Sequence, residues 1–338
     1  MPENRVILSN VLVGVGRAAA KVALSAASIV FLASCGASSP TVTASVPGNP
    51  DVVVGAVPAE SAAALYIAQE RGIFGAHGLH VTIKTIATTS DVIPDMLHGA
   101  IDVASGQFPS FIAAQAAGLG QFHVLASGLS LGPGVNEILA MPSSGIVAPA
   151  GLGNAMIAVN ALAGDGPLLV YSLLSTYGIK PNRVRLKELP FSAMGAELAA
   201  HQIDAAYCTE PYCTEIEQRY GARVIADTDQ GEAKGLPIAG YTVTNSWMHQ
   251  HPRTAAAFAA SISAASLVAE TDVAALQHAL VVSMHISPRV ADLISTGDFP
   301  TTLVPADLQE VADLMLQFGE LKHYFNVDVL TKSLPAAA

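Results

Sequence analysis

The chain repeats one short motif: Ile101-Asp102-Val103-Ala104 with Pro109 five residues further on, and Ile203-Asp204-Ala205-Ala206 with Pro211 five residues further on. The matched positions are 102 residues apart throughout. Each copy follows a helical pattern and precedes another, so both blocks hold a helix, a strand, a proline turn and a helix in the same order. Self-similarity at a fixed offset indicates repeated structural units. The sequence therefore predicts two similar lobes.

Around these motifs, apolar runs of strand length alternate with segments of helix length. In the first block we expect strands at residues 52–57, 81–86, 101–104 and 122–126, and helices from a Ser61 cap to Gly72, up to His98, and at 107–117. After a strand at 138–141, we expect a second block with a strand from Ile157, a helix at 168–177 and a strand at 184–189, ending near Gly240. A further strand at 241–244 and Ala-rich helices from His251 onward follow, as the chain returns to the first lobe. This alternation predicts an α/β fold in which each lobe is a mostly parallel sheet with helices on both faces.

The N-terminus has the pattern of an exported lipoprotein. Arg17 and Lys21 precede about a dozen mostly apolar residues, which end at Leu32-Ala33-Ser34-Cys35. Such a run is the length of a signal-peptide core and too short to span a bilayer. The four-residue pattern is similar to a bacterial lipobox, so we predict a signal peptide at 1–34 and acylation, such as with palmitate, at Cys35. The alternative is an ordinary secretory signal that happens to end in Cys.

Residues 37–50 are rich in Ser, Thr, Pro and Gly and predict a flexible tether over 35–50, with the folded part starting near Asp51. The later stretch at 254–269 is uncharged but Ala- and Ser-rich, and we interpret it as a packed helix instead of a membrane span. Cys208 and Cys213 remain as a pair in an oxidising compartment, where they are either bridged or free.

Charge argues against a nucleic-acid partner. The chain has 16 basic and 27 acidic residues and a net charge of −11, and charged residues make up only 13% of it. A protein that binds the phosphate backbone carries a basic patch instead.

Ligand-binding residues are expected in the loops that follow the strands, because small ligands bind at the carboxyl ends of strands in an open parallel sheet. Three of the candidates also have structural explanations: Glu210 as a helix cap, Asn160 as a turn residue and Tyr241 as hinge packing. The predicted ligand-binding residues are Glu60, Ser61, Thr89, Gln107, Ser110, Asn160, Leu162, Glu210 and Tyr241.

From Asp51 onward the chain resembles the type II solute-binding proteins of ABC importers, in the branch that includes nitrate, taurine, alkanesulfonate and thiamine-precursor binders. The segments that carry this resemblance are 54–58, 65–68, 72–74, 99–104, 157–160 and 203–211. It implies a two-lobed periplasmic-binding-protein type II fold. The lobes would be 51–139 plus 241–330 and 140–240, joined by crossing strands near 138–141 and 241–244, with a disordered tail at 331–338.

The resemblance implies a monomer that captures a small-molecule solute between its lobes and delivers it to the membrane subunits of an ABC permease. It implies no catalysis, cofactor or metal. Two departures leave the solute class open: Pro94, which we expect to shift the start of its helix, and the extra carboxylate Asp165. Together with Glu60 and Glu210, Asp165 would oppose a small anion and suit a ligand with hydrogen-bond donors, such as an amine or a pyrimidine.

Enzymatic alternatives have weaker support. The segment 128–132, Gly-Leu-Ser-Leu-Gly, fits a nucleophile elbow, but the Gly and Pro that follow break the helix that such an elbow requires. His201 and Cys208 are more readily explained as core residues than as a nucleophile pair. The remaining alternative is a cofactor-precursor biosynthetic enzyme built on the same fold. The lipobox argues against that alternative, since such an enzyme is expected in the cytosol.

Overall fold

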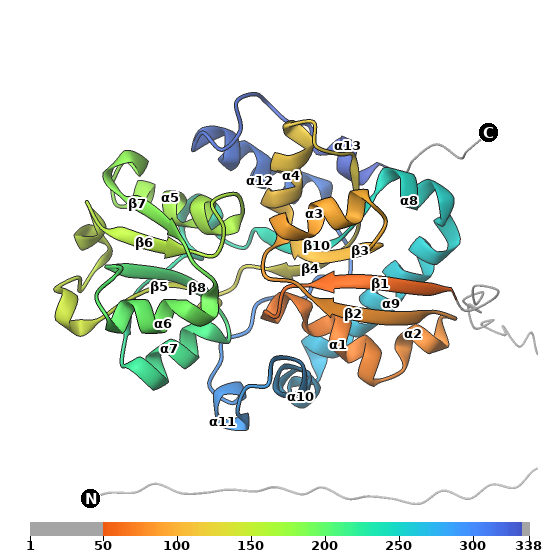
Figure 1. Ribbon diagram of the computed structural model, residues 1–338, viewed down its shortest axis with the longest axis horizontal. Helices are drawn as coiled ribbons and strands as arrows, with labels where there is room; N and C mark the ends of the chain where they lie inside the picture. The colour runs from red at the N-terminus through yellow and green to blue at the C-terminus, as the bar shows by residue number, and fades with distance from the viewer. Residues whose placement is uncertain (1–49, 333–338) are drawn as a thin grey trace, which may run out of the picture. The chain divides into compact units, whose positions relative to one another are not determined.

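A computed structural model describes residues 50–332, which form two five-stranded sheets, each mostly parallel (Figure 1). The first sheet has the strand order β2-β1-β3-β10-β4, and the second has the order β7-β6-β8-β5-β9. In each sheet the fourth strand is antiparallel to both of its neighbours. Both sheets belong to the same compact unit. The predicted α/β class with mostly parallel sheets is therefore confirmed.

The first sheet is built mainly from the N-terminal half of the described chain. Apolar β-branched residues fill its inner strands, where both faces are covered. Its strands are β1 (Asp51–Ala56), β2 (His80–Thr85), β3 (Val103–Gln107), β4 (Phe122–Ser130) and β10 (Pro237–Thr244). The helices and 3-10 turn of this part are η1 (Glu60–Ala62), α1 (Ala63–Glu70), α2 (Ile73–Ala76), α3 (Thr89–Leu97) and α4 (Phe108–Ala116).

The second sheet repeats this plan over the middle of the chain. Its strands are β5 (Asn136–Ala140), β6 (Met156–Val159), β7 (Arg185–Glu188), β8 (Ala205–Thr209) and β9 (Arg223–Asp227). Its helices are α5 (Asp165–Thr176), α6 (Phe191–Ala199) and α7 (Tyr212–Tyr220), with short turns η2 (Pro142–Ser144), η3 (Pro149–Leu152), η4 (Pro181–Arg183) and η5 (Gly231–Ala233). Figure 1 shows α5 on one face of this sheet and α6 and α7 on the other.

The repeated motif has a structural reason. The carboxylate of Asp102 accepts a hydrogen bond from the Val53 amide at 2.8 Å, and Asp204 accepts one from the Met156 amide at 2.7 Å. Each aspartate therefore ties the start of its own strand to the strand beside it. The same offset relates α3 to α6 and β3 to β8. Two residues before each motif, Gly99 and His201 both have positive φ angles, of 74° and 53°.

The chain leaves the first sheet after β4 and returns to it with β10. The strand expected at 138–141 as a crossing is β5 and belongs wholly to the second sheet, and β10 begins at Pro237, before the expected 241. The connections between the sheets therefore lie at 131–135 and 228–236, several residues earlier than expected. Of these two strands only β10 returns to a sheet built from an earlier part of the chain, since it pairs with β3 and β4 of the first sheet.

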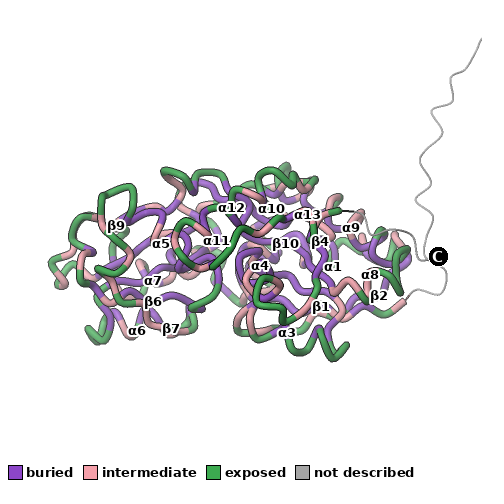
Figure 2. The backbone as a smooth tube through the Cα atoms, turned by 90° about the horizontal axis from the view of Figure 1, so that it is seen from above, coloured by how far each residue is buried: buried purple, intermediate pink, exposed green. Residues whose placement is uncertain are grey.

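The C-terminal helices cover the first sheet and extend beyond it. Figure 1 shows α9 on the same side as α1, and α12 on the same side as α3 and α4. Figure 2 shows the buried backbone concentrated along inner strands such as β10 and the exposed backbone on peripheral loops. The C-terminal helices are α8 (Asn245–Gln250), α9 (Pro252–Thr271), α10 (Val273–Met284), α11 (Pro288–Ala291), α12 (Pro305–Gln317) and α13 (Asp328–Thr331).

Helix α9 is the one described helix that is long and apolar enough to cross a membrane, and half of its apolar window is buried. The ring of Phe258 on this helix lies 5.5 Å from Phe74 and 5.7 Å from Tyr241, measured between centroids. The expected packed helix at 254–269 is therefore confirmed.

Several local expectations need correction or lie beyond the described residues. Ser61 makes no cap and lies inside η1, which Ala59 precedes, and Pro94 lies inside α3 without delaying its start at Thr89. Cys208 and Cys213 are free and buried, so the bridged alternative is not observed. The predicted signal peptide, Cys35 and the tether up to residue 49 lie outside the described residues, as does the predicted tail from residue 333.

Candidate functional site

A small cavity of about 20 Å³ lies where the carboxyl ends of the two sheets meet. That volume is about the size of one water molecule. Two pairs of its lining residues are related by the 102-residue offset: Thr89 with Phe191, and Gln107 with Thr209. The two repeats therefore present matching positions to one space. The lining residues are Val57, Ala59, Ser61, Thr89, Gly106, Gln107, Leu129, Asp165, Phe191, Thr209, Ile238 and Ala239.

Gln107 and Asp165 join the two sides of this cavity. The Gln107 side-chain amide donates a hydrogen bond to an oxygen of Asp165, and its backbone amide donates one to Thr89 Oγ1 at 3.0 Å. Asp165 is 3% exposed. Burial raises the pKa of Asp165 to about 7, while hydrogen bonds from the Tyr207 hydroxyl and the Gly166 amide oppose the rise. Tyr207 is itself hydrogen-bonded to Asn136.

Further hydrogen bonds cross from one sheet to the other. The hydroxyls of Ser110 and Ser90 donate to the carbonyl oxygen of Ala163, at 2.9 and 3.3 Å. The Tyr212 hydroxyl donates to the Pro58 carbonyl at 3.1 Å. Because these groups come from loops at the strand ends, the two sheets meet through polar contacts that can be exchanged for contacts with a ligand or water.

Glu60 and Glu210 lie next to each other on opposite sides of the same junction. The Glu60 backbone amide donates to the Glu210 carbonyl at 3.3 Å. Glu210 Oε2 accepts from the Thr214 amide at 3.2 Å and Oε1 accepts from its hydroxyl at 2.8 Å, so the helix-capping alternative for Glu210 is confirmed. Burial raises the pKa of Glu60 to about 8 and that of Glu210 to about 7, and the nearby Glu210 raises the pKa of Glu60 further.

The Ser295–Phe299 segment crosses this junction and is held by three glutamates. The amides of Ser295, Gly297 and Phe299 donate to the carboxylates of Glu210 (3.4 Å), Glu60 (3.0 Å) and Glu270, respectively. On its other side, the carbonyl oxygen of Asp298 accepts from the Ser130 amide at 2.9 Å. We call residues 295–299 the strap. It links the C-terminal helices to loops of both sheets.

Small residues allow the strap to lie close to the first connection between the sheets. A Cβ atom on Gly297 would lie 2.5 Å from the Ser130 carbonyl oxygen, and one on Gly134 would lie 2.5 Å from the Ser295 hydroxyl. Both distances are shorter than real Cβ contacts. Gly134 also has a positive φ of 79°, which disfavours any side chain there.

The predicted residues separate into groups. Ser61, Thr89 and Gln107 line the cavity, Ser110 bonds across the junction, and Glu60 and Glu210 hold the strap. The remaining three, Asn160, Leu162 and Tyr241, do not line the cavity.

Asn160 is 2% exposed, and neither its amide oxygen nor its amide nitrogen has a hydrogen-bond partner. The side chain of Leu162 is exposed, while its backbone amide donates to Glu188 at 3.0 Å. Tyr241 does not line the cavity. Its ring packs edge-on against Phe258 in the core, which agrees with the packing alternative.

The cavity also contains residues that were not among the predicted binding residues. Asp165 and Phe191 begin α5 and α6, Thr209 ends β8, and Ile238 and Ala239 lie on β10. Phe191 and Thr209 could have been found from the repeat, because they lie 102 residues after the predicted binding residues Thr89 and Gln107. The strap had no comparable signal, since its two partners at the junction, Glu210 and Glu60, are 85 and 237 residues away in the sequence.

Comparison with known families gives one decisive match. The profile of the NMT1-like family matches residues 45–283, which include both sheets and the helices α8 and α9. The chain belongs to the NMT1-like family. Comparison with curated proteins gives no match.

Solved structures of similar fold include two binding proteins and one enzyme. The ligand-binding component of an ABC-type import system from Staphylococcus aureus, with zinc bound, has a TM-score of 0.72 at 18% identity and covers 83% of this chain and 96% of its own. The alkanesulfonate-binding protein SsuA from Xanthomonas axonopodis pv. citri, bound to MOPS, has a TM-score of 0.70 at 17% identity. The alignment covers 83% of this chain and 97% of SsuA. The desulfurization enzyme DSZB has a TM-score of 0.62 at 18% identity, and the alignment covers 82% of this chain and 95% of DSZB.

These likenesses confirm the periplasmic-binding-protein fold that the family resemblance implied for this member of the NMT1-like family. The fold is shared by binding proteins and by an enzyme, so it does not by itself decide between binding and catalysis.

The two sequence features that could indicate catalysis, the elbow-like segment 128–132 and the pair His201 and Cys208, are not arranged as a catalytic site in this NMT1-like chain. Strand β4 continues through Ser130, and the next element is strand β5, so no helix follows the elbow-like sequence. His201 is exposed while Cys208 is buried, so the two do not form a nucleophile pair, and the expectation that His201 is a core residue is wrong. Among residues 50–332, no group of three or more His, Cys, Asp or Glu side chains could hold a metal ion.

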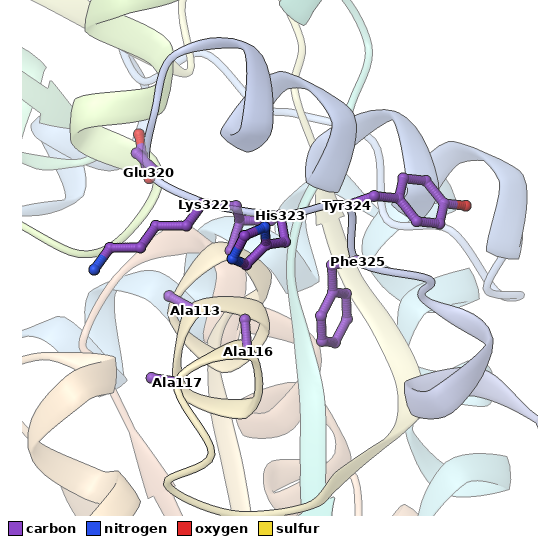
Figure 3. Close-up of a pocket in the computed structure, with 9 residues that line it drawn as sticks. Ala113, Ala116, Ala117, Glu320, Lys322, His323, Tyr324 and Phe325 are labelled. Carbon is purple, nitrogen blue, oxygen red and sulfur yellow. The ribbon is translucent and has the colours of Figure 1, made fainter.

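A larger cavity of about 520 Å³ lies away from the junction, between the alanine face of α4 and the segment after α12 (Figure 3). It contains none of the predicted ligand-binding residues. Figure 3 shows the side chains of Lys322 and Tyr324 pointing to opposite sides, so these polar groups do not converge on one ligand position. Its lining residues are Ala113, Ala116, Ala117, Glu320, Leu321, Lys322, His323, Tyr324 and Phe325.

Proposed function

We propose that this protein is an extracytoplasmic solute-binding lipoprotein of an ABC-type importer, which captures a small polar solute between two lobes. The observation that carries the proposal is the polar junction at the carboxyl ends of both sheets. There Gln107 of the first sheet and Asp165 of the second face the same cavity. In α/β folds this is the place where ligands bind. Solutes of the sulfonate, nitrate, taurine-like and thiamine-precursor classes are the candidates.

Capture requires the two lobes to separate and close again. The cavity of about 20 Å³ is far smaller than the several hundred Å³ of a typical ligand site. A solute would therefore enter only after the bonds from Ser110, Ser90 and Tyr212 to the opposite sheet have opened. A solute that contacts both sides then favours the closed arrangement by its extra contacts there.

Delivery involves two further partners. We propose that acyl chains on Cys35 tether the monomer to the outer face of the bacterial cell membrane and that the closed, loaded form docks on the permease subunits. The lipobox supports the first proposal. Globomycin, which blocks lipoprotein signal peptidase, should cause the uncleaved precursor to accumulate. Processing that is insensitive to globomycin, with Cys35 unmodified, would rule out the anchor.

The proposal is tested by native mass spectrometry of the full-length protein in detergent. We expect a co-purified small molecule that is lost after partial unfolding. Re-addition of that molecule should raise the melting temperature through mass action. The biosynthetic-enzyme alternative predicts a different result, because incubation with protein would convert the molecule to another mass. Recovery of the unchanged molecule supports binding without chemistry.

A further inference from the structure

Three carboxyl groups are buried at the junction between the sheets. Glu60 is 0% exposed, and Asp165 and Glu210 are each 3% exposed. Glu60 comes from the loop after β1, while Asp165 and Glu210 come from loops of the second sheet. Closing the two sheets on each other therefore brings acidic groups from both sides out of water.

None of the three has a basic partner among residues 50–332. The ion pairs of this region are Arg71–Asp272, His80–Asp51, Lys187–Glu197, His278–Glu70 and Lys332–Asp328. Each of them lies outside the junction, and no Lys, Arg or His lines the cavity. Buried carboxylates are normally paired, because an isolated buried charge is very costly.

The junction also has more free acceptors than free donors. Glu60 Oε2 and Gln107 Oε1 are buried and accept no hydrogen bond. A neutral carboxylic acid or amide could satisfy only part of this set. A group that carries several N–H donors and a positive charge would satisfy it and also stabilise the ionised form of a buried carboxyl group.

We propose that the solute is an organic cation, an amine or guanidinium compound, whose charged group binds Asp165 in place of the Gln107 side-chain amide. This inference rests on the proposed function. Gln107 donates to Asp165 in the structure, so an N–H donor is already accommodated at the position where the cation would sit. The released Gln107 carbonyl oxygen would then be a second acceptor for the cation.

An anionic solute does not fit this environment. A sulfonate or nitrate would meet Asp165 and lie near Glu60 and Glu210 with no cationic side chain in the cavity lining. Like charges buried together repel one another in a region of low dielectric. A metal ion is disfavoured by the donor set, since no cluster of three ligating side chains occurs in the described part of the chain.

The test uses full-length protein and three groups of probes at millimolar concentration. The cationic group is putrescine and agmatine, the neutral group is 1-butanol and butyramide, and the anionic group is ethanesulfonate and nitrate. We expect the molecule identified by native mass spectrometry to be a cation. We also expect at least one cationic probe to raise the melting temperature, with no shift from the anionic group.

The variant Asp165→Asn keeps the size of the side chain and removes its charge. It should weaken binding of the cation by about 10- to 100-fold, the range expected for loss of a charge-assisted hydrogen bond. Because an uncompensated acid is removed, the melting temperature of the unliganded variant should be equal to or above that of the wild type. The matched control is Asp313→Asn on the exposed surface of α12, which changes net charge equally and should leave affinity unchanged.

The possible results separate the two proposals. An anionic or neutral molecule that co-purifies, or binds while the cations do not, overturns the cation inference and leaves the solute-binding function intact. A cation whose affinity is unchanged in Asp165→Asn overturns the assignment to Asp165. No bound molecule and no shift with any probe overturn both proposals.

Discussion

Gln107, at the end of β3, donates a hydrogen bond to Asp165, at the start of α5, and this bond joins the two sheets across the cavity. Asp165 is in turn bonded to Tyr207, and Tyr207 to Asn136 on the neighbouring strand β5. The contact is therefore one end of a polar chain that runs into the second sheet. A solute that binds Asp165 displaces the Gln107 amide from it. Because the Asp165 side chain is already held in position by Tyr207, little side-chain entropy is lost on binding.

Glycine at position 240 is required by the packing of the first sheet. A Cβ atom there would lie 2.5 Å from the Ala126 carbonyl oxygen and would also overlap the ring of Phe108. Backbone atoms of a paired strand cannot move aside, so Gly240→Ala should lower the free energy of unfolding by about 1–3 kcal/mol. Chemical denaturation measures the change. Gly75→Ala, in a helix with open space around it, should be neutral or stabilising, and equal effects at both positions would contradict this packing.

The two motif aspartates should contribute similarly to stability. Replacing Asp102 or Asp204 by Ala removes the acceptor for a backbone amide at the start of the neighbouring strand. We expect each change to cost about 1–2 kcal/mol in urea unfolding. Asp95→Ala, at an exposed position near the end of α3, should change stability by less than about 0.5 kcal/mol. Losses at Asp102 and Asp204 no larger than at Asp95 would show that these bonds are not structural.

Stability should fall as the pH rises from about 6.5 to 9. The pKa values of Glu60 and Glu137 are raised to about 8, and those of Asp165 and Glu210 to about 7, mainly by burial. The folded state therefore holds more protons than the unfolded state, whose carboxyl groups titrate near 4. The stability contributed by these groups is complete only below about pH 4, falls as the pH rises from there, and is fully lost once the pH has passed the folded-state pKa values of about 7 and 8.

Calorimetry at several pH values measures this dependence. We expect the melting temperature to decrease by several degrees across the window and Glu60→Gln to flatten the decrease. The window starts at 6.5 because burial lowers the pKa of His123, which has the opposite effect at more acidic pH. A melting temperature that increases from pH 6.5 to 9 would mean that these carboxyl groups are ionised and compensated in the folded protein.

The strap should loosen when its central acceptor is removed. Glu60→Ala leaves the Gly297 amide without its partner, so hydrogen exchange should become faster in residues 293–300. Exchange in β6, which does not contact this carboxylate, should stay the same. Glu310→Ala, on the exposed face of α12, is the matched control and should leave the strap unaffected. Unchanged strap exchange in Glu60→Ala would show that the other contacts hold the segment alone.

The sequence was sufficient for the repeat and for most strands, because the period of the apolar residues and the offset of 102 residues are local properties. It placed Thr89, Gln107 and Ser110 at the junction for the same reason, since each follows the end of a strand in the first repeat. Long-range contacts were not accessible. The carboxylates of Glu60 and Glu210 bind the strap, and nothing near either residue in the sequence indicates that partner.

The direction in which side chains point along β10 also could not be predicted from the sequence. Ala239 lines the cavity, whereas Tyr241, two residues further along β10, packs in the core against Phe258. The pairing of β10 with β4 shifts register between Ala239 and Gly240 and between Tyr241 and Thr242. Such irregularities change which layer a side chain faces, and a two-residue period cannot predict them.

Binding of a solute between the two sheets should slow hydrogen exchange on both sides of the cavity. Mass spectrometry of full-length protein, with and without its co-purified solute, measures this exchange. We predict slower exchange with solute in the loops that hold Thr89, Gln107, Asp165 and Thr209, on both sides of the cavity. Protection confined to one sheet, or to the segment 320–325 beside α4, would contradict binding between the two sheets.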